Sequence, residues 1–230
     1  MSRAVLAALL CVGALAVGPI AAAQELKVLK VARDGQFTSL DPPRHFDSAS
    51  APLVQMAYSA LVRYSHLARP YRLEPDLLAQ MPAVSADGRT YSFTLRQGVR
   101  FHDCTCFAGG AGRELTSDDV IYSFKRFADA NINVKSWSLL DGSIEGLNEF
   151  RAGTQKAGAA ADYAKLDIAG LKKTGSHTFT ITLAAANPRF VQLLAIPPLS
   201  IVPAEAVRAF GDEFGVRPIG TGPFTLDKAE

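Results

Sequence analysis

Hydrophobic and polar side chains alternate most regularly over residues 90–103, which read TYSFTLRQGVRFHD. In an extended strand, Tyr91, Phe93 and Leu95 would point to one face and the polar residues between them to the other. The alternation pauses at a Gln-Gly pair, resumes for a few residues and ends in His-Asp. The pattern therefore predicts a sheet segment with one packed face.

Strand patterns recur at three other places. Residues 26–32 mix alternation with β-branched side chains, and in 177–183 Phe, Ile and Leu alternate with Thr, so that both segments are predicted to be strands. Residues 219–226 predict the beginning of a third strand. The sequence Ala-Asp-Gly-Arg at 86–89 is typical of a turn.

Helical spacing of apolar residues predicts helices over 48–64, 119–128, 188–196 and 203–210. Ser48 or Ser50 is available as the N-cap of the first, and Thr-Ser-Asp-Asp at 116–119 resembles a capping box before the second. The pattern is weaker between 129 and 162, where residues 153–161 predict an exposed loop or a helix turn. This mixed order of strands and helices predicts an α/β or α+β fold class.

The amino terminus has the pattern of a secretory signal peptide. Arg3 supplies a positive charge, residues 4–20 are almost entirely apolar, and Ala-Ala-Ala at 21–23 provides small residues for cleavage. We expect residues 1–23 to be removed, with cleavage after Ala23. Cys11 follows a leucine where a lipoprotein signal requires a small residue, so we expect it to be discarded with the signal.

Composition excludes some classes of function. The chain has 230 residues, of which 48% are hydrophobic and 20% charged, which is typical of a globular protein with one or two packed domains. Its 24 basic and 22 acidic residues give a formal net charge of +2 and are spread along the whole length. No basic stripe is present to neutralise phosphates, so we expect no nucleic-acid partner.

One cluster could carry metal or redox chemistry. His102, Cys104 and Cys106 alternate along the chain, but paired zinc-binding cysteines are usually separated by two to four residues and no second cluster follows nearby. In an oxidising compartment the two cysteines could instead form a local disulfide or pair with another molecule. The sequence leaves these three alternatives open.

The remaining residues give weak evidence for catalysis. No Gly-x-Ser-x-Gly motif is present, and His102 with Asp103 ends a predicted strand, where a surface or packing histidine is more common than a catalytic one. Asp118 and Asp119 lie at a predicted helix N-terminus, which favours acidic side chains without any reaction. We therefore expect no enzyme activity and no cofactor.

Several short motifs occur in a characteristic order. They are Leu-Asp-Pro at 40–42, Ala-Leu-Val at 60–62, Leu-Leu-Ala at 77–79, the run from Asp87 to Asp103, Asp-Asp-Val-Ile-Tyr-Ser-Phe-Lys-Arg at 118–126, and Gly-Thr-Gly-Pro-Phe at 220–224. From about residue 26 to its end, the chain resembles the family 5 extracellular solute-binding proteins, the peptide-binding components of ATP-driven importers. It departs from the family pattern after Asp103, where two cysteines and a glycine-rich insertion through Arg113 intervene.

The resemblance implies a periplasmic-binding-protein-like fold of type II. Residues 24–45 and 170–230 would belong to the first lobe and 46–169 to an inserted subdomain, while the second lobe would be missing and the chain would be an N-terminal fragment. The family acid that pairs with a peptide N-terminus would lie in the missing part. Gly220 to Gly222 would form a turn with a conformational role.

The resemblance also implies the function and its residues. The protein would be a periplasmic monomer that binds peptides or similar small solutes and delivers them to ABC transporter permease subunits. Phe46, Asp47 and Ser48 follow the first strand and would approach the ligand backbone, although Ser48 could equally cap a helix while Asp47 faces water. The alternative is a secreted metal-dependent or hydrolytic enzyme centred on His102, Cys104 and Cys106.

Overall fold

The computed structural model describes residues 27–31, 35–45 and 47–227, and the chain divides into two units, residues 1–33 and 34–230. The predicted signal peptide and Cys11 lie outside the described residues. Residues 27–31 are exposed and have no regular secondary structure, so the strand predicted over 26–32 is wrong there. A strand needs a neighbour for its backbone N–H and C=O groups, and 27–31 pair with no described strand.

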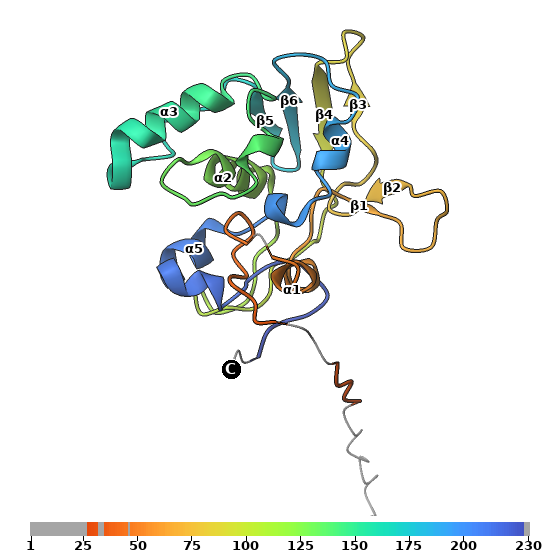
Figure 1. The fold of residues 1–230 in the computed structure, drawn as a ribbon, viewed down its shortest axis with the longest axis vertical. Coiled ribbons are helices and arrows are strands. Elements are labelled where there is room, and N and C mark those ends of the chain that lie inside the picture. The colour runs from red at the N-terminus through yellow and green to blue at the C-terminus, as the bar shows by residue number, and fades with distance from the viewer. Residues whose placement is uncertain (1–26, 32–34, 46, 228–230) are drawn as a thin grey trace, which may run out of the picture. The chain divides into compact units, whose positions relative to one another are not determined.

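The second unit is built around a four-stranded sheet with the order β3-β4-β6-β5 (Figure 1). Its strands are β3 (Ala83–Val84), β4 (Thr90–Thr94), β5 (Leu171–Gly175) and β6 (Thr178–Thr182). Each neighbouring pair is antiparallel, and Phe93 lies opposite Phe179 with ring centroids 4.7 Å apart. The strand predicted over 177–183 is confirmed, whereas β5 was not predicted.

The sheet face predicted from the alternation in 90–103 is confirmed for residues 90–95. Tyr91, Phe93 and Leu95 are buried, and Ser92 and Thr94 between them are exposed. The regular strand ends at Thr94, and beyond it only isolated bridges continue the pairing. The pause at Gln-Gly is a turn, with Gly98 at a φ of +75° that favours glycine.

Helices α2 (Ser117–Ala128) and α3 (Leu147–Ala157) lie beside the sheet (Figure 1). The predicted capping box is confirmed, because the Asp119 carboxylate accepts the Thr116 N–H at 2.9 Å. Of the loop or helix turn predicted over 153–161, the helix turn is confirmed, but α3 begins at Leu147, which was not predicted. Leu147 and Phe150 are buried in the core and hold the helix in place.

Helix α1 (Ser50–Ala57) is shorter than the helix predicted over 48–64. The chain leaves the helix after Ala57 and forms β1 (Val62–Tyr64), which pairs antiparallel with β2 (Leu73–Pro75). Backbone N–H groups of Gly222 and Phe224 donate to the carbonyls of Ala57 and Met56, at 3.0 and 3.1 Å. A distant segment thus satisfies the last carbonyls of α1.

The carboxyl-terminal part contains helices α4 (Phe190–Leu193) and α5 (Ala204–Phe210), which confirm the short helices predicted over 188–196 and 203–210. Short 3₁₀ segments are η1 (Trp137–Leu139), η2 (Gly158–Ala160), η3 (Pro197–Leu199) and η4 (Gly211–Gly215). The strand predicted to begin at 219 is wrong for the described residues, because 219–227 join no sheet. Their N–H groups contact α1 instead.

Two hydrophobic clusters form the core of this unit. The larger one surrounds the sheet and includes Phe93, Phe124 and Phe179, and the smaller one lies against α1 and α5 and includes Val54 and Phe214. The predicted mixed α/β class is confirmed. The division at residues 46 and 169 remains a prediction, and the sheet takes strands from both sides of residue 169.

No helix among the described residues is long and apolar enough to cross a membrane.

Candidate functional site

The predicted ligand-contacting residues lie immediately before α1. Phe46 is outside the described residues, so its prediction stays untested. The Asp47 carboxylate accepts hydrogen bonds from the Ser50 N–H at 2.6 Å, from the Ser50 hydroxyl at 2.7 Å and from the Thr38 hydroxyl. Desolvation opposes ionisation of Asp47, but these hydrogen bonds outweigh it and hold its pKa well below the usual range. Asp47 therefore organises the first turn of α1.

Ser48 is exposed, and its hydroxyl makes no hydrogen bond with the described residues. It does not cap α1, because the Ser50 N–H is taken by Asp47. Contact of Asp47 and Ser48 with a ligand remains a prediction.

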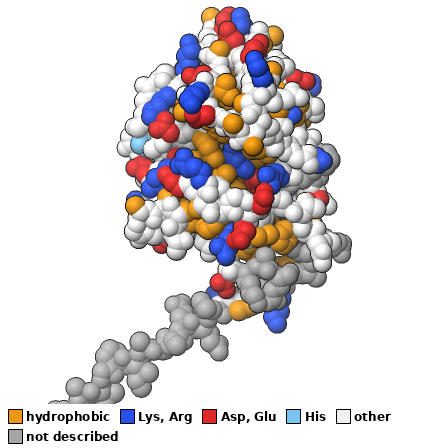
Figure 2. All heavy atoms as spheres, turned by 90° about the vertical axis from the view of Figure 1, so that its left-hand side faces the viewer, with side chains coloured by type: hydrophobic (Ala, Val, Ile, Leu, Met, Phe, Trp, Pro, Cys, Tyr) orange, Lys and Arg blue, Asp and Glu red, His pale blue; other side chains and the backbone are white. Residues whose placement is uncertain are grey.

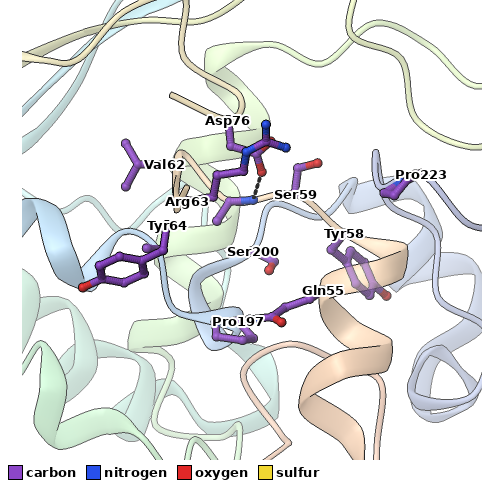
Figure 3. Close-up of a pocket in the computed structure, with 12 residues that line it drawn as sticks. Gln55, Tyr58, Ser59, Val62, Arg63, Tyr64, Asp76, Pro197, Ser200 and Pro223 are labelled. Atoms are coloured by element: carbon purple, nitrogen blue, oxygen red, sulfur yellow. Dashed lines mark hydrogen bonds and ion pairs between the residues drawn. The ribbon is translucent and has the colours of Figure 1, made fainter. Parts of the chain in front are cut away.

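A pocket of about 390 Å³ lies near the other end of α1 (Figure 3). Its walls come from the end of α1, from strand β1, from the residue after β2, from the region of η3 and from the 220–224 segment. The lining residues are Gln55, Tyr58, Ser59, Ala60, Val62, Arg63, Tyr64, Asp76, Ala195, Pro197, Ser200 and Pro223. The structure does not bring Asp47 or Ser48 into this pocket.

Asp76 supplies the carboxylate of the pocket. Its Oδ2 accepts the Ala60 N–H at 3.1 Å, and its Oδ1 lies 3.9 Å from Nη1 of Arg63. Figure 3 shows the side chains of Asp76 and Arg63 next to each other. Burial raises the pKa of Asp76, although the Ala60 hydrogen bond and the Arg63 cation act in the opposite direction. Arg63 is itself held by Glu74, with Nε to Oε1 at 2.8 Å.

The rest of the lining combines aromatic rings with neutral polar groups. Gln55, Ser59 and Ser200 offer amide and hydroxyl groups, and Tyr64 is half exposed. The ring of Tyr58 is buried against Phe214 at a centroid distance of 6.3 Å. Such a lining can exchange hydrogen bonds with the polar groups of a small solute while its rings contact the apolar groups of that solute. The chemistry of these lining groups therefore favours the binding of a small solute.

Sequence reasoning did not identify this pocket. The acids at Glu74 and Asp76 stand out in a short apolar stretch, but nothing in the pattern places them beside α1. The hairpin of β1 and β2 makes that connection, since Leu77 N–H donates to the Ala60 carbonyl at 3.1 Å.

His102 and Asp103 turn to different backbone partners. Nε2 of His102 lies 2.7 Å from the Gly222 carbonyl oxygen, and the His102 N–H donates to the Gly220 carbonyl at 2.8 Å. Oδ1 of Asp103 accepts the Gly112 N–H at 2.8 Å. The two side chains therefore fix loops at the end of the sheet segment.

The 220–224 segment needs its glycines because it runs against α1. A Cβ on Gly222 would overlap the Met56 carbonyl oxygen, and a Cβ on Gly220 would overlap that of Ala57. A conformational role for this turn remains a prediction.

Cys104 and Cys106 form a disulfide, which is one of the alternatives left open by the sequence. Their sulfurs are bonded to each other and are not free thiolates. Among the described residues, no group of three or more His, Cys, Asp or Glu side chains is arranged to hold a metal ion.

Comparison with protein families gives a match over residues 72–230 to the model described as bacterial extracellular solute-binding proteins, family 5 Middle. Di/tripeptide-binding protein 2 of Pseudomonas aeruginosa is 31% identical over 220 residues, which cover 88% of this chain and 36% of that protein. The glutathione-binding protein GsiB of Escherichia coli O1:K1 is 28% identical over 201 residues, covering 87% of this chain and 32% of that protein. The chain thus spans about a third of the length of these relatives.

Among solved structures, peptide-bound OppA of Listeria monocytogenes superimposes with a TM-score of 0.68 at 21% identity. The superposition covers 84% of this chain and 34% of that one. At this identity the likeness concerns the fold.

Proposed function

Because this chain belongs to the family 5 bacterial extracellular solute-binding proteins, we propose that its protein binds peptides or similar small solutes outside the cytoplasmic membrane. It delivers them to the permease subunits of an ATP-driven importer. The observation that carries this proposal is the family match over 72–230, together with relatives named for binding di- and tripeptides or glutathione. The fold, of the OppA type, agrees with the periplasmic-binding-protein-like class expected from the sequence.

The pocket of Figure 3 supports a binding role. It presents a carboxylate, an amide and hydroxyl groups beside aromatic rings, which are the groups that recognise a peptide main chain without altering it. We propose that Asp76 accepts a hydrogen bond from a ligand N–H. Phe46, Asp47 and Ser48 remain the contacts proposed from the family resemblance.

The location and organisation of the protein are part of the same proposal. Residues 1–23 would be a signal peptide that directs export, and the family is described as extracellular. Residues 24–45 and 170–230 would form one lobe with 46–169 inserted, and the protein would act as a monomer beside its permease.

The enzyme alternative centred on His102, Cys104 and Cys106 is not favoured. The two sulfurs form a disulfide and the His102 ring is bound to the Gly222 carbonyl, so these groups are already engaged. A zinc assay separates the two functions: stoichiometric zinc that is lost in Cys104→Ser would favour the enzyme.

The main test is a thermal-shift and calorimetric titration of the exported protein, as its host produces it, with di- to pentapeptides and glutathione. A ligand that binds the folded state raises its stability by about 2.7 kcal/mol when the ligand concentration is one hundred times Kd.

Asp76→Asn should weaken binding of peptides with a free amine about tenfold or more, since a hydrogen bond to a charged group is replaced by a neutral one. Asp87→Asn, on an exposed turn outside the pocket, is the matched control. Absence of stabilisation by every peptide tested would overturn the proposed function.

A further inference from the structure

A second concavity, which we call the α2/α5 hollow, lies between α2, α5 and the loop after α3. It encloses about 580 Å³ and shares no lining residue with the pocket of Figure 3. Its lining residues are Arg44, Tyr122, Arg126, Asp129, Ile132, Ala161, Asp162, Tyr163, Ala164, Val207, Arg208, Gly211 and Asp212. Figure 2 faces the side of the molecule on which α3 and α5 lie in Figure 1, and hydrophobic side chains gather across its middle between charged ones.

The acids that line this hollow are already engaged. Asp129 accepts the Tyr163 hydroxyl at 2.6 Å and two donors of Asn131 at 2.8 and 2.9 Å. Asp162 accepts the Ala164 N–H at 3.0 Å and lies 3.4 Å from Nζ of Lys165.

Asp212, the third acid, pairs with Arg44 at 3.2 Å. Arg44 and Arg126 on the basic side both bind Asp41, at 3.4 and 2.7 Å. These carboxylates and these two guanidinium groups therefore have partners within the protein.

Two donors remain open in the hollow. The guanidinium of Arg208 is exposed, and the hydroxyl of Tyr122 lies at a half-buried position; among the described residues neither has a hydrogen-bond or ion-pair partner. Burial raises the pKa of the Tyr122 hydroxyl, against the opposing effect of Arg126 and Arg208, so the phenol is neutral and can donate. A guanidinium that makes no ion pair with the described residues, close to a neutral phenolic donor, can bind an anion.

Apolar and aromatic groups form the remainder of the wall. Ile132 and Val207 are half-buried there, and the rings of Tyr122 and Tyr163 stand at 50° with centroids 5.8 Å apart. These surfaces would contact an apolar body while the open donors hold its charged end.

From this arrangement we propose that the α2/α5 hollow binds a small organic carboxylate with an apolar or aromatic body. The carboxylate lies at the Arg208 guanidinium and the Tyr122 hydroxyl, and the body lies against Ile132, Val207 and Tyr163. This site is separate from the pocket of Figure 3 and does not depend on the proposed peptide binding.

The test is calorimetric titration of the exported protein, as its host produces it, with phenylacetate and with its neutral analogue phenylacetamide. Phenylacetate should bind, and the amide should bind about tenfold more weakly or not at all, because a charge-assisted contact is lost. Arg208→Gln should weaken phenylacetate about tenfold or more, and Tyr122→Phe about threefold or more. Arg189→Gln is the matched control, since Arg189 is also exposed but lies outside the hollow.

Equal binding of acid and amide, equal binding to the Arg208→Gln variant, or no phenylacetate binding by the folded protein would each overturn the proposal. Peptide affinity measured at saturating phenylacetate should be unchanged, and competition between the two would contradict a separate site. If phenylacetate binds while no peptide does, the carboxylate site stands and the proposed function fails.

Discussion

The guanidinium of Arg126 donates two hydrogen bonds to the carboxylate of Asp41, at 2.7 and 2.8 Å, across 85 residues of sequence. Both side chains are buried, with exposed fractions of 6% and 3%. Arg126 belongs to α2, whereas Asp41 lies in the segment before α1. The pair therefore ties the segment that leads into α1 to the helix beside the sheet.

Removing one member of this pair should lower the free energy of unfolding substantially. Arg126→Met leaves a buried carboxylate with only Arg44 nearby, and we expect a loss of about 3–5 kcal/mol in the free energy of unfolding. Asp41→Asn combined with Arg126→Met should lose less, because no uncompensated charge remains. Urea unfolding of the three proteins measures both values, and a single variant within about 1 kcal/mol of wild type would contradict a stabilising pair.

The contact of His102 with Gly222 should hold the 220–224 segment against α1. His102→Ala removes the 2.7 Å hydrogen bond and should lower the free energy of unfolding by about 1 kcal/mol. Amide exchange at Gly222 and Phe224, which donate to α1, should become faster. His66→Ala is the control because His66 is exposed; unchanged exchange in His102→Ala would show that the contact does not anchor the segment.

Asp47 should make the stability of α1 depend on pH. Its pKa is held low in the folded protein, mainly by Thr38 and Ser50 acting against desolvation, whereas the unfolded value is about 3.9. The stabilisation is therefore complete above that value and is lost as the pH falls toward the folded pKa. Asp47→Ala should cost about 1 kcal/mol at neutral pH, as for other helix caps, and less in acid. Ser48→Ala, measured by the same unfolding titrations, should show no such dependence.

The contribution of Asp76 to the pH dependence of stability should have the opposite sign. Burial raises its pKa, so the ionised form is penalised in the folded state above the folded pKa, and the penalty disappears as the pH falls below it. Asp76→Asn keeps an acceptor for the Ala60 N–H without the charge, and it should be at least as stable as wild type at neutral pH. Thermal unfolding should show this advantage shrinking in acid; an Asp76→Asn protein that is less stable at neutral pH than in acid, relative to wild type, would contradict the burial penalty.

Local patterns were informative where they depended on neighbours in sequence. Alternation located β4 and β6, and the Thr-Ser-Asp-Asp sequence located the capping box of α2, because side-chain direction and capping are set within a few residues. Helix α3 was missed because its glycine and alanine content weakens the apolar spacing, while the buried Phe150 compensates through packing.

Patterns failed where an element depends on a distant partner. The first helix was expected to continue to residue 64, but it ends at Ala57 and the chain goes on to form the hairpin of β1 and β2. Backbone N–H groups of the 220–224 segment donate hydrogen bonds to the last carbonyls of this helix. Residues 27–31 alternate like a strand and yet pair with no described strand. Asp47 was placed near the correct helix, but its role as the hydrogen-bonding centre of the first turn required coordinates.

The sequence alone determined the family, the sheet face of 91–95 and the capping box of α2, because each is encoded in the local order of residues. Tertiary structure alone decided the disulfide among its alternatives, the pairing of Asp41 with Arg126, and the grouping of Asp76 with the end of α1. Such contacts join residues far apart in the chain, and their partners are selected by packing and by the need to satisfy buried polar groups, which no short stretch of sequence specifies.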